Sequence, residues 1–394
     1  MKHYFDICEY GACPDGKTIN TQAIQKAIDA CHQAGGGRVL CGAGCYLTGS
    51  LMLKSNVELH LMTGCKIVGN TCLDDYGDFV APGFIGDWPE AGIKSLICAS
   101  EAENIAITGP GEINGSGMSF YDVNSAAPSG KLSKPATPRP RIVMFYKCRH
   151  VRFEDTSFVD SSYWTFWLMK CQEVNIHRVK ISGNRRMRTT DGIDIDSCRN
   201  VTVSDSLIDT EDDCLVLRAI QRMYDTPAVC ENITVNNCVL DSQCQGIRVG
   251  CPGDGIIRNC TFSNLIIHSA LGNGILFEYP KRYLPKDGQT TADVHDILFS
   301  NVVIDCAKWP IKVVVEDGIK LPRLADLSFS NFRIKSGGPC LVQGSRETTI
   351  RNVSFSNIEI ETSGEDAIIC RHCQGVKLAN VNLSNRSEPC PDVK

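Results

Sequence analysis

The sequence contains no apolar run long enough to cross a lipid bilayer, and its first residues hold no apolar core of signal-peptide length. We therefore expect no transmembrane helix and a cytoplasmic location. A strong excess of one charge is missing too, because the net charge is only -5 over 394 residues. This balance argues against nucleic acid or an anionic membrane as the main partner. The signatures of leucine-rich and propeller repeats are also absent.

The sequence does contain 22 cysteines. Several share one position, three residues before a β-branched residue: Cys148, Cys171, Cys198, Cys230 and Cys373. This register predicts a column of stacked thiols that act as small buried hydrophobes, and a reducing compartment would keep them free. Strands of neighbouring coils lie roughly 4.8 Å apart, which is within disulfide reach, so disulfides remain the alternative.

A short apolar segment recurs every 23 to 37 residues from residue 148 onward. Asn or Ser usually follows it, and then a second short apolar strand. Short strands, irregular loops and Asn-rich corners are typical of an all-β, right-handed parallel β-helix, a solenoid that grows without splitting into domains. We therefore expect a single β-helix domain over residues 1–394. The repeated segments are Val151–Phe153, Val174–Ile176, Val201–Val203, Ile233–Val235, Cys260–Phe262, Ile297–Phe299, Leu327–Phe329, Val353–Phe355 and Val376–Leu378.

The N-terminal part predicts a helix over 20–34 that covers the open end of the solenoid. Asn20 or Thr21 can cap it, and Gly35 to Gly37 end it. Its expected buried face is Ile24, Ala27, Ile28 and Cys31, and the expected strands after it are Arg38–Leu40, Tyr46–Leu53 and Val57–Leu61. Two turn-rich insertions, 70–95 and the proline-rich 115–140, precede regular coils over 148–384 and a frayed tail. Long loops of this kind are usually functional or disordered.

Two acidic stretches, Thr189–Asp196 and Thr210–Arg218, align with Asp191 over Asp213 at an offset of 22 residues. Gln245 and Asn273 continue the column after further offsets of 32 and 28 residues. Each stretch continues with apolar residues at alternate positions, the pattern of a strand with one buried face. If each offset is one coil, these polar residues form a column with acidic side chains crowded at one end.

Asp191, Asp212 and Asp213 are the candidate catalytic residues of this column. Like-charge repulsion raises some pKa values in such a cluster, and glycosidic hydrolysis needs an acid and a base of different pKa. Two other interpretations remain open. Asp and Asn satisfy turns at β-helix corners, and clustered carboxylates suit a Ca²⁺ site.

The motifs Thr189–Ile193, Glu211–Cys214 and Gln245–Gly250 resemble those of the polygalacturonase family, glycoside hydrolase family 28. The opening, with Asp6–Ala12, Asp15–Thr18, Ala27–Ala30 and Tyr46–Gly49, is similar to that of bacterial members. The resemblance implies an inverting hydrolase without metal or cofactor. It implies Asp212 as the general acid, with Asp191 and Asp213 holding and deprotonating the attacking water.

Later motifs depart from the family pattern. Gln245 stands at the family histidine position, and Leu276 and Glu278 stand where the family has an Arg and a Lys that bind the substrate carboxylate. The chain is similar in this respect to rhamnogalacturonan-cleaving relatives, which also lack these basic residues. By the alignment, Arg248 and Lys312 lie one coil before and one coil after Leu276.

We therefore expect Gln245, Arg248, Glu278 and Lys312 to bind substrate. Arg218, two coils before Glu278, and Trp167, which faces outward one coil before Asp194, complete the candidate set. A guanidinium binds a carboxylate with two hydrogen bonds, and an indole can stack on a sugar. The alternatives are that the basic residues are solvated or neutralise the aspartates, and that Trp167 is an ordinary sheet aromatic.

The sequence thus predicts an inverting glycoside hydrolase that is exo-acting on short pectin-derived oligosaccharides, of galacturonate or rhamnogalacturonan type. The alternatives are a glycosidase of the same fold for a non-uronate glycan, a Ca²⁺-dependent β-helix lyase, and a non-catalytic glycan-binding β-helix. No nucleic-acid or membrane partner is expected, and the sequence leaves the oligomeric state open.

Overall fold

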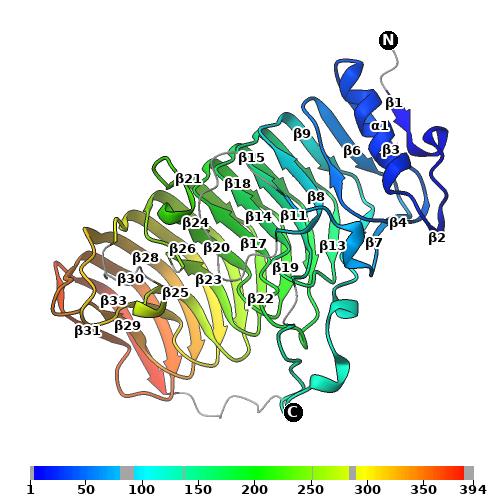
Figure 1. The fold of residues 1–394 in the computed structure, drawn as a ribbon. Helices are drawn as coiled ribbons and strands as arrows, with labels where there is room; N and C mark the ends of the chain where they lie inside the picture. Colours follow the sequence, from blue (N-terminus) through cyan, green and yellow to red (C-terminus); the bar gives the residue numbers. More distant parts are fainter. Residues whose placement is uncertain (1–3, 80–92, 136–137, 251, 284–289, 386–394) are drawn as a thin grey trace. The chain divides into compact units, whose positions relative to one another are not determined.

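The computed structural model describes residues 4–79, 93–135, 138–250, 252–283 and 290–385. The chain divides into two compact units, one of Met1–Asp194 with Cys198–Glu211 and one of Ile195–Ser197 with Asp212–Lys394. Both units consist mainly of short strands (Figure 1). That one domain covers residues 1–394 stays a prediction.

In the first unit, the chain visits three stacks of parallel strands in turn, so each strand pairs with its counterpart from the next coil. The first stack is β1 (Tyr4–Asp6), β3 (Gly37–Cys41), β6 (Val57–Leu61), β9 (Glu103–Thr108), β12 (Arg149–Glu154), β15 (Gln172–His177) and β18 (Arg199–Ser204). The second is β2 (Asp15–Ile19), β4 (Gly44–Thr48), β7 (Cys65–Gly69), β10 (Glu112–Asn114), β13 (Ser157–Val159), β16 (Lys180–Ser182) and β19 (Leu207–Thr210). The third is β5 (Leu51–Met52), β8 (Ser95–Ser100), β11 (Arg141–Tyr146) and β14 (Phe166–Met169).

The second unit repeats this parallel pairing. One stack is β20 (Leu215–Arg218), β23 (Gln245–Val249), β25 (Asn273–Tyr279), β27 (Ile311–Val315), β29 (Cys340–Gln343) and β31 (Ile368–Arg371). The other contains β21 (Val229–Asn236), β22 (Val239–Ser242), β24 (Ile256–Ser269), β26 (Asp293–Cys306), β28 (Arg323–Ser336), β30 (Ile350–Thr362), β32 (Cys373–Gln374) and β33 (Lys377–Asn385). The predicted right-handed parallel β-helix class is confirmed.

The repeated apolar segments of the sequence are the buried stacks of these coils, except for the last, Val376–Leu378, in which Leu378 is 56% exposed. In the second unit the rings of Phe262, Phe299, Phe329 and Phe355 stack on one another, with centroids 4.4, 5.3 and 5.1 Å apart. Each long strand also bends at an asparagine with a positive φ angle, such as 55° at Asn264, because Asn tolerates the left-handed region. The amides of these asparagines form a ladder of hydrogen bonds between successive coils at Asn237, Asn264, Asn301, Asn331, Asn357 and Asn380.

Helix α1 (Thr21–Gln33) confirms the predicted N-terminal helix, and it contacts β1, β3, β5 and β6. Its buried residues are the four predicted: Ile24, Ala27, Ile28 and Cys31. Asn20 holds the predicted N-cap position, but its side chain makes no capping hydrogen bond. The Asn20 side chain accepts a hydrogen bond from the Cys13 amide instead (2.7 Å), and the Thr21 hydroxyl accepts one from Gly49.

Two further expectations change. The strand predicted over 46–53 is divided into β4 and β5, because the chain turns at Gly49 from the second stack to the third. The 115–140 insertion carries two short 3₁₀-helices, Gly117–Phe120 and Val123–Ser125, and packs Tyr121 and Leu132 against Met187. Most of the 70–95 insertion and of the predicted C-terminal tail lies outside the described residues.

The predicted thiol column is present within the first unit, where Val151, Val174 and Val201 pair in register and each follows a buried cysteine by three residues. All 20 cysteines in the described part of the chain are free, including Cys230 in the second unit. No helix among the described residues has the length and apolar character to span a bilayer. The cytoplasmic location stays a prediction.

We expect thiol titration of the unfolded protein, without reductant, to detect nearly all of its 22 cysteines. Buried thiols such as Cys98 and Cys260, whose pKa values burial raises to about 12, should react only after unfolding, because the thiolate is the reactive form. Titration of the native protein supplies the control. If most of the cysteines were blocked after unfolding, the free-thiol column would be wrong.

Candidate active site

Asp212 and Asp213 lie directly before β20, at the corner where the chain enters this strand. Leu215 and Leu217 of β20 point into the core and anchor the strand, and both are fully buried. The Cys214 amide donates a hydrogen bond to the Gln245 carbonyl (3.0 Å) and so joins this corner to the next coil. Asp213 is only 1% exposed, whereas Asp212 is partly exposed.

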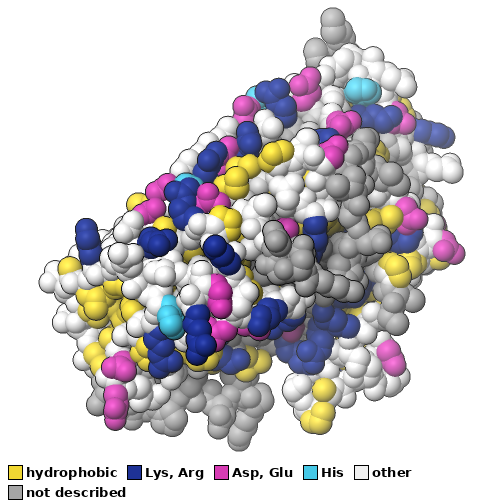
Figure 2. Space-filling view, turned by 60° about the vertical axis from the view of Figure 1, so that its left-hand side comes forward, with side chains coloured by type: hydrophobic (Ala, Val, Ile, Leu, Met, Phe, Trp, Pro, Cys, Tyr) yellow, Lys and Arg dark blue, Asp and Glu magenta, His cyan; other side chains and the backbone are white. Residues whose placement is uncertain are grey.

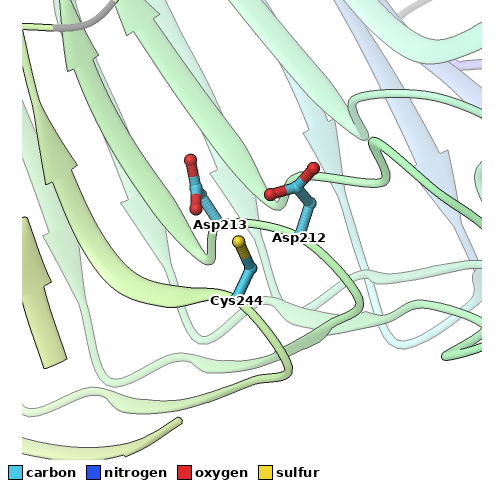
Figure 3. Close-up of side chains that lie close together, drawn as sticks. All are labelled: Asp212, Asp213 and Cys244. Atoms are coloured by element: carbon cyan, nitrogen blue, oxygen red, sulfur yellow. The ribbon is translucent and has the colours of Figure 1, made fainter. Parts of the chain in front are cut away.

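The two carboxylates share their corner with a thiol. One oxygen from each of Asp212 and Asp213 and the sulfur of Cys244 all lie within 4.8 Å of one another. Figure 3 shows the thiol pointing toward the gap between the two carboxyl groups. Ca²⁺ requires six to eight oxygen ligands, so a set of two carboxylates and a soft thiol does not fit the calcium interpretation.

Arg248 joins the carboxyl pair to the next coils. Its Nη1 donates to Asp213 Oδ2 at 3.1 Å and its Nη2 to Glu278 Oε2 at 3.2 Å. The register places Arg248 beside Leu276, and Leu276 beside Lys312, as the sequence predicted. The Lys312 Nζ lies 4.3 Å from the centre of the Trp309 ring. Two basic residues, Arg248 and Lys312, therefore flank Leu276 on the neighbouring strands.

Burial raises the pKa of Asp213 to about 7, and the negative charge of Asp212 adds to this rise, whereas Arg248 and Arg218 oppose it. Because this pKa is close to 7, Asp213 gains and loses its proton near neutral pH. Its Oδ1 is buried and accepts no hydrogen bond from the described residues. Asp213 therefore suits proton transfer to or from a bound molecule.

The predicted column continues below Asp213, because Gln245 pairs in register with Asn273. The Asn273 main-chain amide and its Nδ2 both donate to Gln245 Oε1, at 3.0 and 2.7 Å. The Gln245 Nε2 donates to Cys244 Sγ at 3.0 Å. Both ends of the Gln245 amide are therefore engaged within the protein, and its substrate contact stays a prediction.

In the first unit, Asp191 lies two residues before β17 (Ile193–Asp196), as Asp213 lies two residues before β20. Its carbonyl accepts a hydrogen bond from Thr165 (2.8 Å), and its side chain is buried. The sequence therefore placed the two aspartates at equivalent points of their coils. The catalytic roles of Asp191, Asp212 and Asp213 stay predictions at this point.

Trp167 does not offer the exposed ring that sugar stacking requires. Its side chain lies on the outward side of β14, yet it is 1% exposed. The Arg141 guanidinium lies 4.6 Å from its ring centre, and Trp164 packs edge-on against it at 5.4 Å. The expectation of a stacking platform is therefore corrected: Trp167 is a buried sheet aromatic.

Arg218 is also buried, at 1% exposure, so it does not present a guanidinium to solvent as a substrate-binding residue would. Its carbonyl accepts the Ser197 amide (2.9 Å), and its positive charge lowers the pKa of Asp213. This charge favours the alternative that Arg218 neutralises the aspartates, and its substrate contact stays a prediction.

Cys244 is the site residue that the sequence analysis missed. Periodicity gave no signal, because Cys244 lies in the turn before β23 and outside the alternating strand pattern. The same offset of 32 residues that aligns Asp213 with Gln245 aligns Asp212 with Cys244. That alignment would have found it.

Comparison with known proteins agrees with this geometry. The chain is 24% identical over 396 residues to an exopolygalacturonase of Zea mays, covering 96% of this chain and 83% of that protein. It is also 24% identical over 355 residues to an endo-polygalacturonase of Pectobacterium carotovorum, covering 86% and 84%. The solved structure of a hyperthermoactive exopolygalacturonase from Thermotoga maritima superposes with a TM-score of 0.76 at 21% identity, over 96% of this chain and 92% of that one.

The superposed structure shares the fold of this chain, and a family model matches a range that includes the acidic motifs. The model described as glycosyl hydrolases family 28 matches residues 31–394, which is most of the chain. The chain therefore belongs to glycosyl hydrolases family 28, and it is a glycoside hydrolase of the polygalacturonase type.

Proposed function

We propose that this protein is an inverting hydrolase that removes single sugars from one end of short, pectin-derived oligosaccharides. The observation that carries the proposal is the carboxyl pair of Asp212 and Asp213. One member is partly exposed, and the other is buried with a pKa raised to about 7 by that burial. Two carboxyl groups in different environments are what acid–base hydrolysis of a glycoside requires.

In the proposed mechanism, Asp212 donates its proton to the glycosidic oxygen as the bond from that oxygen to the anomeric carbon breaks. A water molecule attacks the opposite face of the anomeric carbon. Asp191 and Asp213 hold this water and accept the proton that it loses. The free acceptor atom Oδ1 of Asp213 supports this role. No metal or cofactor is required.

The product anomer tests this mechanism. Because the water attacks the face of the anomeric carbon opposite the leaving group, the first product should be inverted. We expect NMR to detect the inverted anomer before mutarotation mixes the two forms. A retained anomer as the first product would exclude the mechanism.

The position of Arg248 supports the proposal that the substrate carries an acidic sugar. Arg248 is partly exposed, and one of its partners, Glu278, is an acidic side chain that a uronate carboxylate can replace. Lys312 lies two strands further along the same register. A guanidinium that binds a carboxylate through two parallel hydrogen bonds gives both affinity and orientation. A galacturonate- or rhamnogalacturonan-type terminal sugar fits these groups.

The exopolygalacturonases of Zea mays and Thermotoga maritima are among the similar proteins, which supports release from one end. With defined oligogalacturonides, chromatography should detect a monosaccharide and a substrate shortened by one unit as the first products. An early mixture of intermediate lengths would indicate internal cleavage.

A Ca²⁺-dependent lyase is the second candidate, and the donor set argues against it, as described above. An unsaturated product that disappears on addition of EDTA would favour a lyase. A glycan-binding protein without activity would bind these oligosaccharides tightly and leave them intact, so the same product analysis separates the three functions.

A further inference from the structure

The direction of each hydrogen bond in the chain that ends at Cys244 follows from two main-chain amides. The Trp309 amide can only donate, and it lies 3.3 Å from Asn273 Oδ1, so the Asn273 Nδ2 faces Gln245. The Asn273 amide likewise donates to Gln245 Oε1, so the Gln245 Nε2 faces Cys244. Both side-chain amide orientations are therefore determined, which is uncommon for Asn and Gln.

The sulfur of Cys244 consequently accepts a hydrogen bond from Gln245 and keeps its own proton to donate. Burial and the charges of Asp213 and Asp212 raise the pKa of the Cys244 thiol, so the S–H form persists near neutral pH. Asp212 supplies the acceptor, because one of its carboxylate oxygens lies within 4.8 Å of the sulfur. Figure 3 shows the sulfur directed toward the gap between the two carboxyl groups.

Ser242 fixes the other side of this arrangement. Its hydroxyl donates to the Asp212 carbonyl at 2.6 Å and accepts the Cys244 amide at 2.7 Å. The main chains of Asp212 and Cys244 are thus tied to the same hydroxyl, although they belong to adjacent coils. The distance between thiol and carboxyl is therefore set by the backbone rather than by flexible side chains.

We propose that Cys244 is a positioning residue for Asp212, aligned in turn by Gln245, and that its S–H orients the carboxyl group that protonates the leaving sugar. The proposal rests on the hydrolysis proposed above. A hydrogen bond donated to a carboxylate favours the charged form, so the thiol stabilises Asp212 once it has given up its proton. The position therefore requires a donor, which serine also provides and alanine does not.

The test compares Cys244→Ala, Cys244→Ser and Gln245→Leu with Cys260→Ala. Cys260 is a buried thiol of β24 whose sulfur donates to the Arg258 carbonyl (3.2 Å), so it controls for the loss of packing. We expect Cys244→Ala to lower kcat roughly 3- to 10-fold with little change in KM, the range for one hydrogen bond. The alkaline limb of its pH–rate profile should move to higher pH, and Cys244→Ser should restore both values. The control should lower thermal stability alone.

Gln245→Leu should lower kcat less than Cys244→Ala, and the double variant should be no slower than Cys244→Ala alone, since both substitutions remove one linked interaction. If Gln245 binds substrate instead, KM rises and the two losses multiply. That outcome, or a Cys244→Ala variant with the wild-type pH profile, would overturn the positioning role.

A spectroscopic measurement makes the inference independent of turnover. The infrared S–H stretch of Cys244 is obtained as the difference between wild type and Cys244→Ser. We expect it at the frequency of a hydrogen-bonded thiol, and at that of a free thiol in Asp212→Ala. A free-thiol frequency in wild type would refute the contact. If wild type showed the bonded frequency but no hydrolysis, the proposed function and the positioning role would both be refuted. The contact between Cys244 and Asp212 would then stand without a catalytic role.

Discussion

Asp212→Asn should lower kcat at least ~100-fold, the usual contribution of a positioned general acid. The amide keeps the size and most of the hydrogen bonds of the carboxyl group but has no proton to donate to the glycosidic oxygen. Because Asp212 is the partly exposed member of the pair and Asp213 is 1% exposed, the substitution should leave folding intact. Activity is measured as sugar released from defined oligogalacturonides, and folding is measured by thermal unfolding.

Asp305→Asn supplies the matched control. Asp305 lies on β26 in the other strand stack of the second unit, in register with His268 and Lys335, so the same chemical change there should leave kcat within about twofold, as expected for a surface substitution. Near-full activity of Asp212→Asn on the best substrate would show that another group donates the proton.

Arg248→Ala should lower kcat/KM by one to two orders of magnitude, corresponding to roughly 1.5–3 kcal/mol for a charge-assisted hydrogen bond. The structure adds a second consequence. Arg248 opposes the rise in the pKa of Asp213, so its removal raises that pKa further. A carboxylate base is active only when ionised, so activity is lost as pH falls through its pKa. The acid limb should therefore move to higher pH, and the loss should be larger below pH 7 than above it.

Two further variants separate the roles of Arg248. Arg248→Lys keeps a charge near Asp213 but loses the paired geometry, so it should restore the acid limb and leave KM for uronates raised. Arg258→Ala removes a comparable ion pair between adjacent coils, with Glu231 at 2.7 Å, and should change neither value. Unchanged kinetics of Arg248→Ala would mean that Arg248 only balances the charge of the aspartates. A raised KM without a shift of the acid limb would mean that Arg248 binds substrate but does not affect the pKa of Asp213.

Much of the fold could be predicted because the β-helix repeats the same physical requirement on every coil. An apolar residue at alternate positions must point inward, so the spacing of Val151, Val174 and Val201 was enough to predict that they pair. The same logic placed Arg248, Leu276 and Lys312 in one row. A strand register depends on backbone pairing, which the sequence pattern reports directly.

The spacing of residues along the sequence does not show which side chains cover the outer side of a strand. The predictions that the structure changes concern such side chains and turns. Trp167 and Arg218 are on the outward side of their strands, as the pattern indicated, but other side chains cover them. The side chain of Asn20 bonds to a loop seven residues earlier in place of the helix terminus. Cys244 is in a turn, where no periodic signal exists. Burial on the outer side and turn contacts depend on residues from elsewhere in the chain.

In the second unit, the proposed catalytic carboxyl groups and most of the proposed substrate-binding residues lie at different strands of the stack. The carboxyl pair precedes β20, whereas Leu276 and Glu278 are on β25 and Lys312 is on β27. Each coil of a solenoid contacts mainly its immediate neighbours, so substitutions on β27 leave the surroundings of Asp212 and Asp213 unchanged, whereas Glu278 of β25 is linked to Asp213 through Arg248. Selection can therefore alter the sugar that is bound without rebuilding the machinery that cleaves it. Leu276 and Glu278, which stand where the resemblance implies an Arg and a Lys, are the kind of divergence that this layout permits.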